Sequence, residues 1–175
     1  EHMASSESLY FFPVSKLSDF QIPKEVLENP GTSSVWFYQD LLSVPFLVNN
    51  SYHITNSVSC CRVLKHPDTD SIKYAYIIYL DASEFSSILQ EIFHDNQITS
   101  YILTDNGKIV ASNNPSLLSA SLDEEKLDFL YNKGDSLKKR AHTNYHTTTL
   151  RNGWLQVTEI PDSYIMQNTH ILIKS

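Results

Sequence analysis

The sequence is poor in glycine and cysteine, and it has no excess of positive charge. Four glycines in 175 residues leave no glycine-rich loop whose backbone amides could hold phosphate groups. A formal net charge of −7 repels polyanions, which argues against nucleic acid or an anionic membrane surface as the main partner. The two cysteines, Cys60 and Cys61, are adjacent. In an extended segment their side chains point to opposite faces, so neither a disulfide nor a metal site is expected from them.

Long apolar runs are also absent. The longest strongly apolar run, Tyr74 to Leu80, is far shorter than the ~20 residues that cross a bilayer. Residues 1–5, EHMAS, read as a vector remnant and are left out of the fold argument. Sequences that begin this way are usually excised pieces, so any membrane anchor is expected outside the given boundaries.

Motifs of catalysis and metal binding are missing as well. The sequence contains no GxSxG and no HExxH. His142 and His146 have the spacing of a helical metal site, but the threonines that follow favour a turn and a strand. Asp68 and Asp70, beside His66, lack the glycine and distal glutamate of a calcium loop. We therefore expect no catalytic residue, no metal and no cofactor.

Apolar and aromatic residues are plentiful. Hydrophobic residues make up 41% of the chain, with ten Tyr, eight Phe and two Trp, so a real core can form. The part up to Pro67 is irregular, with at most one or two helical turns at 24–28. Its short strand candidates are Leu9 to Phe12, Val35 to Tyr38 and Ser57 to Leu64.

The middle of the chain predicts a strand followed by a helix. Residues 73–80, KYAYIIYL, are apolar on both faces, which indicates a central strand of a covered sheet. Asp81 with Glu84 has the spacing of a capping box at a helix start. One apolar helix face follows: Phe85, Ile88, Leu89, Ile92 and Phe93.

The last third predicts two hairpins and two helices. Asn106-Gly107 and Asn152-Gly153 predict tight turns of type I′. The expected flanking strands are 101–103 with 108–111, and 145–150 with 154–159. Ser121 with Glu124 is expected to cap a short helix carrying Leu127, Leu130 and Tyr131, with Gly134 near its end. Pro161 ends the last strand, and Asp162 to Ile173 is expected to be helical.

Three segments together resemble a known family. They are YIIYLDASEF (76–85), SYILTDNGKIVASNN (100–114) and GWLQVTEIPDSYI (153–165). Their order is similar to that of the extracellular Cache domains, a PAS-like family, of bacterial sensor histidine kinases. The resemblance covers roughly residues 33–173, and its motifs are short and degenerate.

The resemblance implies an α+β fold of the Cache type, in which helices flank a PAS-like antiparallel sheet. It implies two lobes, the distal one truncated or irregular. Residues 6–95 would form this distal sensor lobe with the connecting helix, and residues 96–175 the membrane-proximal lobe with an exit helix. Amino-acid-sensing members carry an Arg just before a Trp-Tyr pair. Ser34 and Val35 stand there instead, which argues against amino-acid recognition by that route.

The resemblance also implies a function: an extracytoplasmic sensor domain of a membrane histidine kinase, dimeric in the full-length protein. Its partner would be a small-molecule ligand or an extracellular protein. Tyr and Trp suit a pocket as well as a core, so the candidate ligand-binding residues are the aromatic residues Trp36, Tyr38, Tyr52, Tyr74 and Tyr76.

Alternatives remain open. The same resemblance allows the sensor region of a membrane-bound transcription regulator or of a chemoreceptor. A protein-interaction module with exposed aromatic residues belongs to a second class. A small hydrolase or transferase that uses His66 with Asp68 belongs to a third, although nothing in the sequence activates a nucleophile there.

Overall fold

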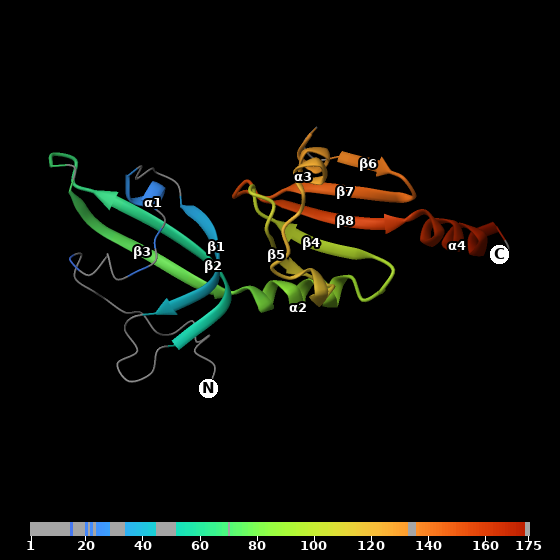
Figure 1. Cartoon of the computed structure of the whole chain (residues 1–175), viewed down its shortest axis with the longest axis horizontal. Coiled ribbons are helices and arrows are strands. Elements are labelled where there is room, and N and C mark those ends of the chain that lie inside the picture. The colour runs from blue at the N-terminus through green and yellow to red at the C-terminus, as the bar shows by residue number, and fades with distance from the viewer. Residues whose placement is uncertain are drawn as a thin grey trace. The chain divides into compact units, whose positions relative to one another are not determined.

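The computed structural model describes residues 15, 20, 22, 24–28, 34–44, 52–69, 71–132 and 136–173 (Figure 1). The chain divides into two compact units, Glu1–Ala82 and Ser83–Ser175. Each unit contains an antiparallel sheet with helical segments, so the α+β class is confirmed. The helix that the sequence argument placed at the end of the first lobe is grouped with the second unit. The strand expected at 9–12 lies outside the described residues, as do Asp70 and Gly134.

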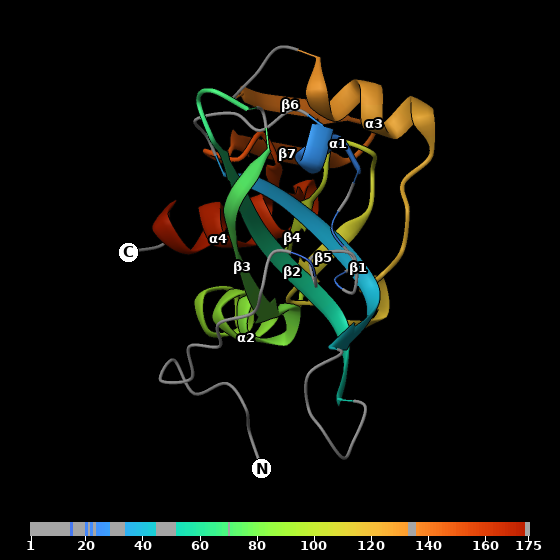
Figure 2. The ribbon, with the colours of Figure 1, turned by 90° about the vertical axis from the view of Figure 1, so that its left-hand side faces the viewer.

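The first unit is a three-stranded antiparallel sheet with one short helix. The strands are β1 (Val35–Val44), β2 (Tyr52–Lys65) and β3 (Ile72–Asp81), in the order β1-β2-β3. The helix α1 (Lys24–Glu28) has the predicted bounds and lies beside the strands (Figure 2). Because side chains alternate along a strand, the register defines two faces. Trp36, Cys60 and Ile78 form one row across the sheet on one of them.

The opposite face of this sheet carries the core of the first unit. Cys61 and Val63 of β2 are buried there against Val26 of α1. Partly buried Phe37, Ala75 and Ile77 surround them. The apolar side of α1 is thereby covered, which explains how a helix of five residues forms at all.

The prediction that residues 73–80 form a central, covered strand is wrong. β2 is the middle strand, and among the described residues β3 pairs with β2 alone. Tyr74, Tyr76 and Ile78 are 51%, 41% and 50% exposed. Tyrosine tolerates such a position because it combines an apolar ring with a polar hydroxyl that can stay in contact with water.

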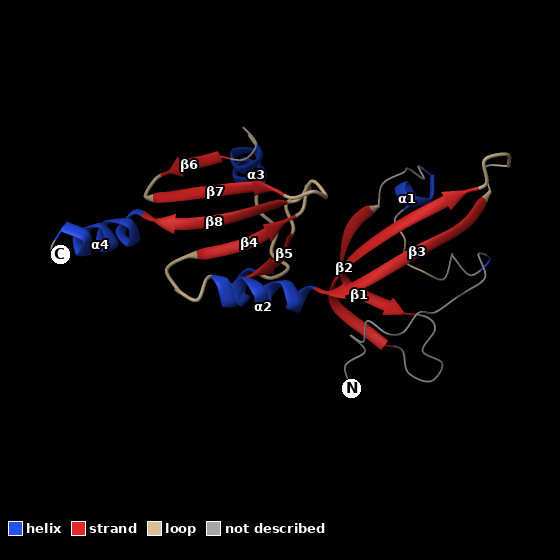
Figure 3. Cartoon of the chain, turned by 180° about the vertical axis from the view of Figure 1, so that it is seen from behind, coloured by secondary structure: helices blue, strands red, loops and turns tan. Residues whose placement is uncertain are grey.

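The second unit is a five-stranded antiparallel sheet in the order β5-β4-β8-β7-β6, with helices on its flanks (Figure 3). Its first and last long strands, β4 and β8, are neighbours. The elements in chain order are α2 (Ala82–Ile92), β4 (Thr99–Leu103), β5 (Ile109–Ser112), η2 (Pro115–Leu117), α3 (Glu124–Tyr131), β6 (Ser136–Arg140), β7 (Thr143–Thr149), β8 (Leu155–Pro161) and α4 (Asp162–Ile173).

The core of this unit lies between one sheet face and α3. Tyr101 and Leu103 of β4, Leu155 and Val157 of β8 and Leu130 of α3 are buried together. Three polar side chains interact at the edge of this core. The Tyr101 hydroxyl donates to Glu159 Oε1 at 2.7 Å, and Lys126 Nζ lies 2.9 Å from the same oxygen. Burial, and then the Glu159 charge, raises the pKa of Tyr101, so this hydroxyl keeps its proton and remains a donor.

Both Asn-Gly hairpins form where they were predicted, but their turn type differs. Gly107 and Gly153 have φ of +83° and +86°, whereas neither Asn106 nor Asn152 has a positive φ. A type I′ turn needs a positive φ at both central residues. Each loop is therefore one residue longer, a type I turn closed by a left-handed glycine. The bonds Gly107 N to Thr104 O and Gly153 N to Leu150 O, at 3.0 and 2.9 Å, close them.

Two helix predictions need correction. The cap of α3 is Asp123, whose side chain accepts from Lys126 N at 2.8 Å. Ser121 is not the cap and instead forms a strand bridge with Lys108. In α2 the buried face consists of Ala82, Ser86 and Leu89, while two members of the predicted apolar face are exposed: Ile88 and Ile92.

The C-terminal predictions agree with the structure. β8 ends at Pro161, and α4 runs from Asp162 to Ile173 as expected. β6, whose sequence is SLKKR, was not anticipated. Within the described part of the chain, no helix is both long and apolar enough to span a membrane.

Candidate functional site

Four of the five predicted aromatic residues lie on one face of the first sheet. Trp36 and Tyr38 alternate along β1, and Tyr74 and Tyr76 alternate along β3. All four stand on the side opposite the Cys61 core, because Trp36 pairs with Cys60 and Tyr76 pairs with Arg62. We call this side the aromatic face. The fifth residue, Tyr52, pairs with Val44 in the backbone of β2, and its side chain is outside the described part.

Hydrogen bonds hold two of these tyrosines in place. The Tyr38 hydroxyl donates to Asn56 Oδ1 at 2.6 Å. Asn56 has φ of 58°, a backbone conformation that asparagine tolerates better than most residues. The Tyr76 hydroxyl and Ser34 Oγ are 2.9 Å apart, and either can be the donor. The aromatic face therefore presents preoriented rings next to exchangeable hydroxyl donors.

Arg62 is a member of this face that the sequence argument missed. It is the Cα partner of Tyr76 and is half-buried. Its Nε is buried and, among the described residues, has no hydrogen-bond partner. Strand alternation places Arg62 on the same face as Cys60, but the pairings that bring it beside Tyr76 come from the structure.

The two cysteines of β2 point to opposite faces of the same sheet, Cys60 to the aromatic face and Cys61 to the core. Cys60 and Cys61 are buried free thiols. Burial, and then the neighbouring Cys60, raises the pKa of the Cys61 thiol to about 11. Because the thiolate is the nucleophilic form, Cys61 behaves as a small apolar core residue.

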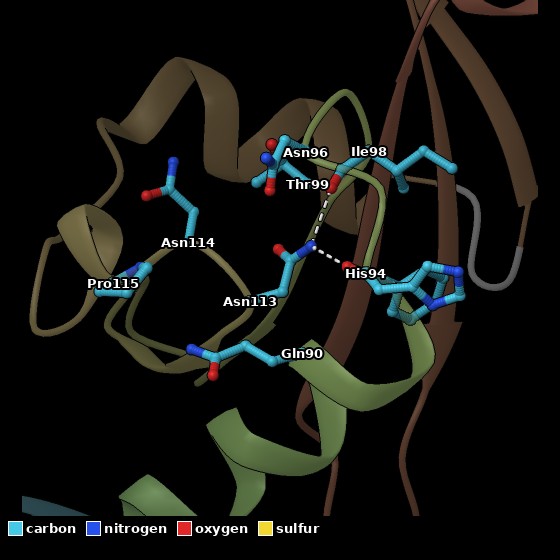
Figure 4. Close-up of a pocket in the computed structure, with 9 residues that line it drawn as sticks. Gln90, His94, Asn96, Ile98, Thr99, Asn113, Asn114 and Pro115 are labelled. Carbon is cyan, nitrogen blue, oxygen red and sulfur yellow. Dashed lines mark hydrogen bonds between the residues drawn. The ribbon is translucent and has the colours of Figure 1, made fainter.

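The second unit contains a polar pocket of about 520 Å³ at the end of α2 (Figure 4). Gln90 and His94 line it from the helix side, and Asn113 lines it after β5. Asn113 is fully engaged: its Nδ2 donates to Phe93 O and Ile98 O, and its Oδ1 accepts from Ser100 N at 2.8 Å. The remaining lining residues are Phe93, Asn96, Ile98, Thr99, Asn114 and Pro115.

Two of the amides in this pocket serve the backbone. Asn113 fastens the segment between α2 and β4, and the Asn114 side chain accepts from Ser116 N at 3.1 Å as the cap of η2. Gln90, His94 and Asn96 are exposed around them. The amides of Asn113 and Asn114 therefore stabilise the loops around the pocket. Sequence reasoning did not single out Asn113 or Asn114 as structural residues.

A second polar cluster fixes the start of α4. Asp162 binds Lys139 Nζ of β6 at 2.8 Å and accepts from Asn144 Nδ2 of β7 at 2.7 Å. Its backbone N–H donates to His142 O at 2.8 Å. The hydrogen bonds from Lys139 and Asn144 hold the pKa of the Asp162 carboxyl below its ordinary value. We call this cluster the α4 clamp.

Groups suited to metal binding or acid-base catalysis are dispersed. Among the described residues no three His, Cys, Asp or Glu side chains gather as a metal ion would require. His142 lies in a turn and His146 in β7, so their spacing is not helical. His66 and Asp68 both lie in the exposed turn between β2 and β3.

Comparison with known proteins finds similarity in structure alone. No family model and no curated protein matches the chain. The periplasmic sensory domain of the Campylobacter jejuni chemoreceptor Tlp1 has a TM-score of 0.62 at 9% identity, covering 87% of this chain and 58% of that domain. The extracellular domain of rpHK1S-Z16, described as a histidine kinase, has a TM-score of 0.51 at 11% identity, covering 85% and 61%.

A third neighbour is the ligand-binding domain of the Pseudomonas aeruginosa PAO1 amino-acid chemoreceptor PctC, in complex with GABA. Its TM-score is 0.51 at 11% identity, with coverage of 78% of this chain and 59% of that domain. The chain thus spans about three fifths of the length of these neighbours. Its fold is that of the Cache-like sensor domains found outside the membrane in chemoreceptors and histidine kinases.

Proposed function

We propose that this chain is the extracytoplasmic signal-sensing domain of a membrane-bound sensor histidine kinase and that it binds a small-molecule ligand. The observation that carries the proposal is the Cache-like fold, which the chain shares with ligand-binding domains outside the membrane. The order of the three sequence segments, which resembles that of kinase ectodomains, supports the kinase assignment. The chain itself would catalyse nothing, and the full-length protein would be a dimer.

A chemoreceptor is the alternative output, because two of the three neighbours belong to chemoreceptors. The native gene product distinguishes the two. A kinase core downstream of residue 175 supports our proposal, and a methyl-accepting coiled coil supports the alternative. A native chain with no transmembrane segment would contradict both.

The proposed binding surface is the aromatic face, with Trp36, Tyr38, Tyr74 and Tyr76 as contacts and Tyr52 as a further candidate. It combines large ring area with oriented hydroxyl groups, which is the composition of many small-molecule sites. The pocket at Asn113 is a weaker candidate, since its central amide is already saturated by the backbone.

Ligand binding predicts a rise in melting temperature. A compound that binds the folded state alone stabilises it by RT ln(1 + [L]/Kd), about 2.7 kcal/mol at 100 times Kd. Screening organic acids, sugars, amines and nucleosides by thermal shift should therefore yield at least one class that raises the melting temperature in a saturable manner. If no compound does so while the chain is retained on an extracellular partner protein, the interaction module replaces small-molecule sensing.

The α4 clamp fits the proposed route of the signal. α4 follows β8 directly, and Asp162 at its first turn is held by two strands. A ligand can shift the domain between two arrangements only as far as its affinities for them differ. We propose that the clamp passes such a shift from the sheet to the helix.

The clamp makes a pH-dependent contribution to stability. A carboxyl whose folded-state pKa lies below its ordinary value of 3.8 stabilises the fold above that value and loses the effect as the pH falls through the folded pKa. The His142→Gln protein should therefore melt at a higher temperature than the His142→Gln, Asp162→Asn double variant at about pH 6, and the difference should shrink as the pH falls below 3.8 through the folded-state pKa. Both proteins should carry His142→Gln, because His142 Nδ1 lies 3.9 Å from Asp162. A difference independent of pH would show that the charge of Asp162 is not what matters.

A further inference from the structure

We propose that Arg62 is the anchor for a carboxylate group and that the ligand of the aromatic face is an organic acid with an apolar or aromatic body and no ammonium group. This inference rests on the proposed function, because it names the ligand class of the same surface. It goes beyond the fold comparison, which says nothing of Arg62.

The first observation is the Nε of Arg62. Arg62 Nε is buried, and among the described residues it has no acceptor, nor does its guanidinium form an ion pair with any of them. A buried donor without an acceptor is rare in folded proteins, and an unoccupied ligand position is one of its physical explanations. The planar fork of the guanidinium matches the two oxygens of a carboxylate.

The second observation is a pair of hydroxyl groups on the strands beside Arg62. Tyr76 is its Cα partner on β3, and Ser34 directly precedes Val35, which pairs with Cys61 next to Arg62. The Ser34 and Tyr76 oxygens are 2.9 Å apart, so their hydrogen bond joins the two outer strands above the middle one. Only one of the two protons is used in that bond. The other can be donated to an anion bound at Arg62.

The third observation is the apolar and acid-free character of the surroundings. Trp36 and Tyr74 are the diagonal neighbours of Arg62 on the aromatic face, within the reach of aromatic side chains. None of the neighbours of Arg62 that the described strands place on this face is an Asp or Glu. Within the described strands, alternation places one acid on this face, Asp40, about 20 Å along β1 from Ser34. An ammonium group would find no counter-charge beside the carboxylate site among the strand residues that the structure describes.

Benzoate is a suitable probe, because it combines a carboxylate with a flat apolar body. The chain has three arginines, Arg62, Arg140 and Arg151, so the ¹H–¹⁵N spectrum of the Nε groups contains few signals. Arg140 is already paired with Glu125 at 2.6 Å, and Arg151 lies in an exposed turn. These two are internal controls. Sodium benzoate should be titrated against sodium chloride at equal ionic strength, beside benzyl alcohol, phenyl phosphate and inorganic phosphate.

We expect a saturable shift of the Arg62 signal with benzoate at millimolar concentration and no such shift at Arg151. Benzyl alcohol should give none, and Arg62→Lys should weaken benzoate binding at least tenfold while the backbone spectrum and melting temperature stay close to wild type. Equal, linear shifts at Arg62 and Arg151 would show that benzoate acts by nonspecific electrostatic attraction, and would contradict a binding site at Arg62. Tighter binding of inorganic phosphate or phenyl phosphate than of benzoate would overturn the carboxylate class.

The outcomes also separate this inference from the proposed function. If the thermal-shift screen yields a neutral or cationic ligand whose effect survives Arg62→Lys, sensing stands and the carboxylate site fails. If benzoate binds at Arg62 but the native chain has no transmembrane segment, the site stands and the sensing function fails.

Discussion

Replacing Leu103 by alanine is expected to lower the free energy of unfolding of the second unit by about 2–5 kcal/mol. Leu103 is 0% exposed and lies in the cluster that joins β4, β8 and α3. The substitution removes buried methyl groups and leaves a cavity that the neighbouring strands cannot fill without breaking their register.

The matched control is Leu137→Ala, the same chemical change on β6. Leu137 is 72% exposed, so its truncation should change stability by less than about 0.5 kcal/mol. The chain has two tryptophans, one in each unit: Trp36 in β1 and the buried Trp154 beside β8. In a Trp36→Phe background, Trp154 fluorescence during urea unfolding reports on the second unit alone. Similar losses for Leu103→Ala and Leu137→Ala would mean that the assigned core is wrong.

Local signals in the sequence predicted the elements that depend on local physics. The helix α4 begins directly after Pro161, and α1 has the expected bounds. Both Asn-Gly sites turn the chain, since glycine supplies the positive φ that each loop needs. These features depend on residues within a few positions of each other, and short patterns describe them well.

Features that depend on distant partners were predicted less well. β6 is charged at three of its five positions, and it becomes a strand because β7 offers it an edge to pair with. The apolar run of β3 indicated burial on both sides, yet that strand ends up beside β2 only, among the described residues. The buried side of α2 includes Ser86 and not the expected Ile88. The Ser86 Oγ accepts a hydrogen bond from Ser112 N at 3.2 Å. No single-sequence pattern encodes that contact.

The candidate site shows the same division. The four aromatic residues share a face because of strand alternation and register. For Tyr74 and Tyr76, the two-residue period of a strand was enough to predict a shared face. Placing Trp36 and Tyr38 on the same face as these two needed the pairings of β2 with both neighbours. Arg62 was missed because a single arginine in an apolar strand has no motif. Its importance arises from the missing acceptor, which only coordinates reveal.

Replacing Tyr76 by alanine is expected to lower the affinity for the ligand identified by the thermal-shift screen by about 30-fold, or about 2 kcal/mol. Tyr76 contributes in two ways: its ring covers the aromatic face, and its hydroxyl completes the pair with Ser34. Tyr76→Phe keeps the ring and loses the hydroxyl, so it should lose about tenfold or less. The affinities of the three proteins, measured by isothermal titration calorimetry, separate the ring from the hydroxyl.

Ile165→Ala is the control for this prediction, because Ile165 is an exposed apolar residue of α4 in the second unit. It should leave the affinity unchanged, since the proposed contacts all lie in the first unit. An equal loss in both variants would point to a general effect of surface hydrophobicity. Unchanged affinity in Tyr76→Ala would instead remove the aromatic face as the binding surface and turn attention to the Asn113 pocket. Because Tyr76 is already 41% exposed, its truncation costs little folding energy, and a loss of affinity can be assigned to the ligand contact itself.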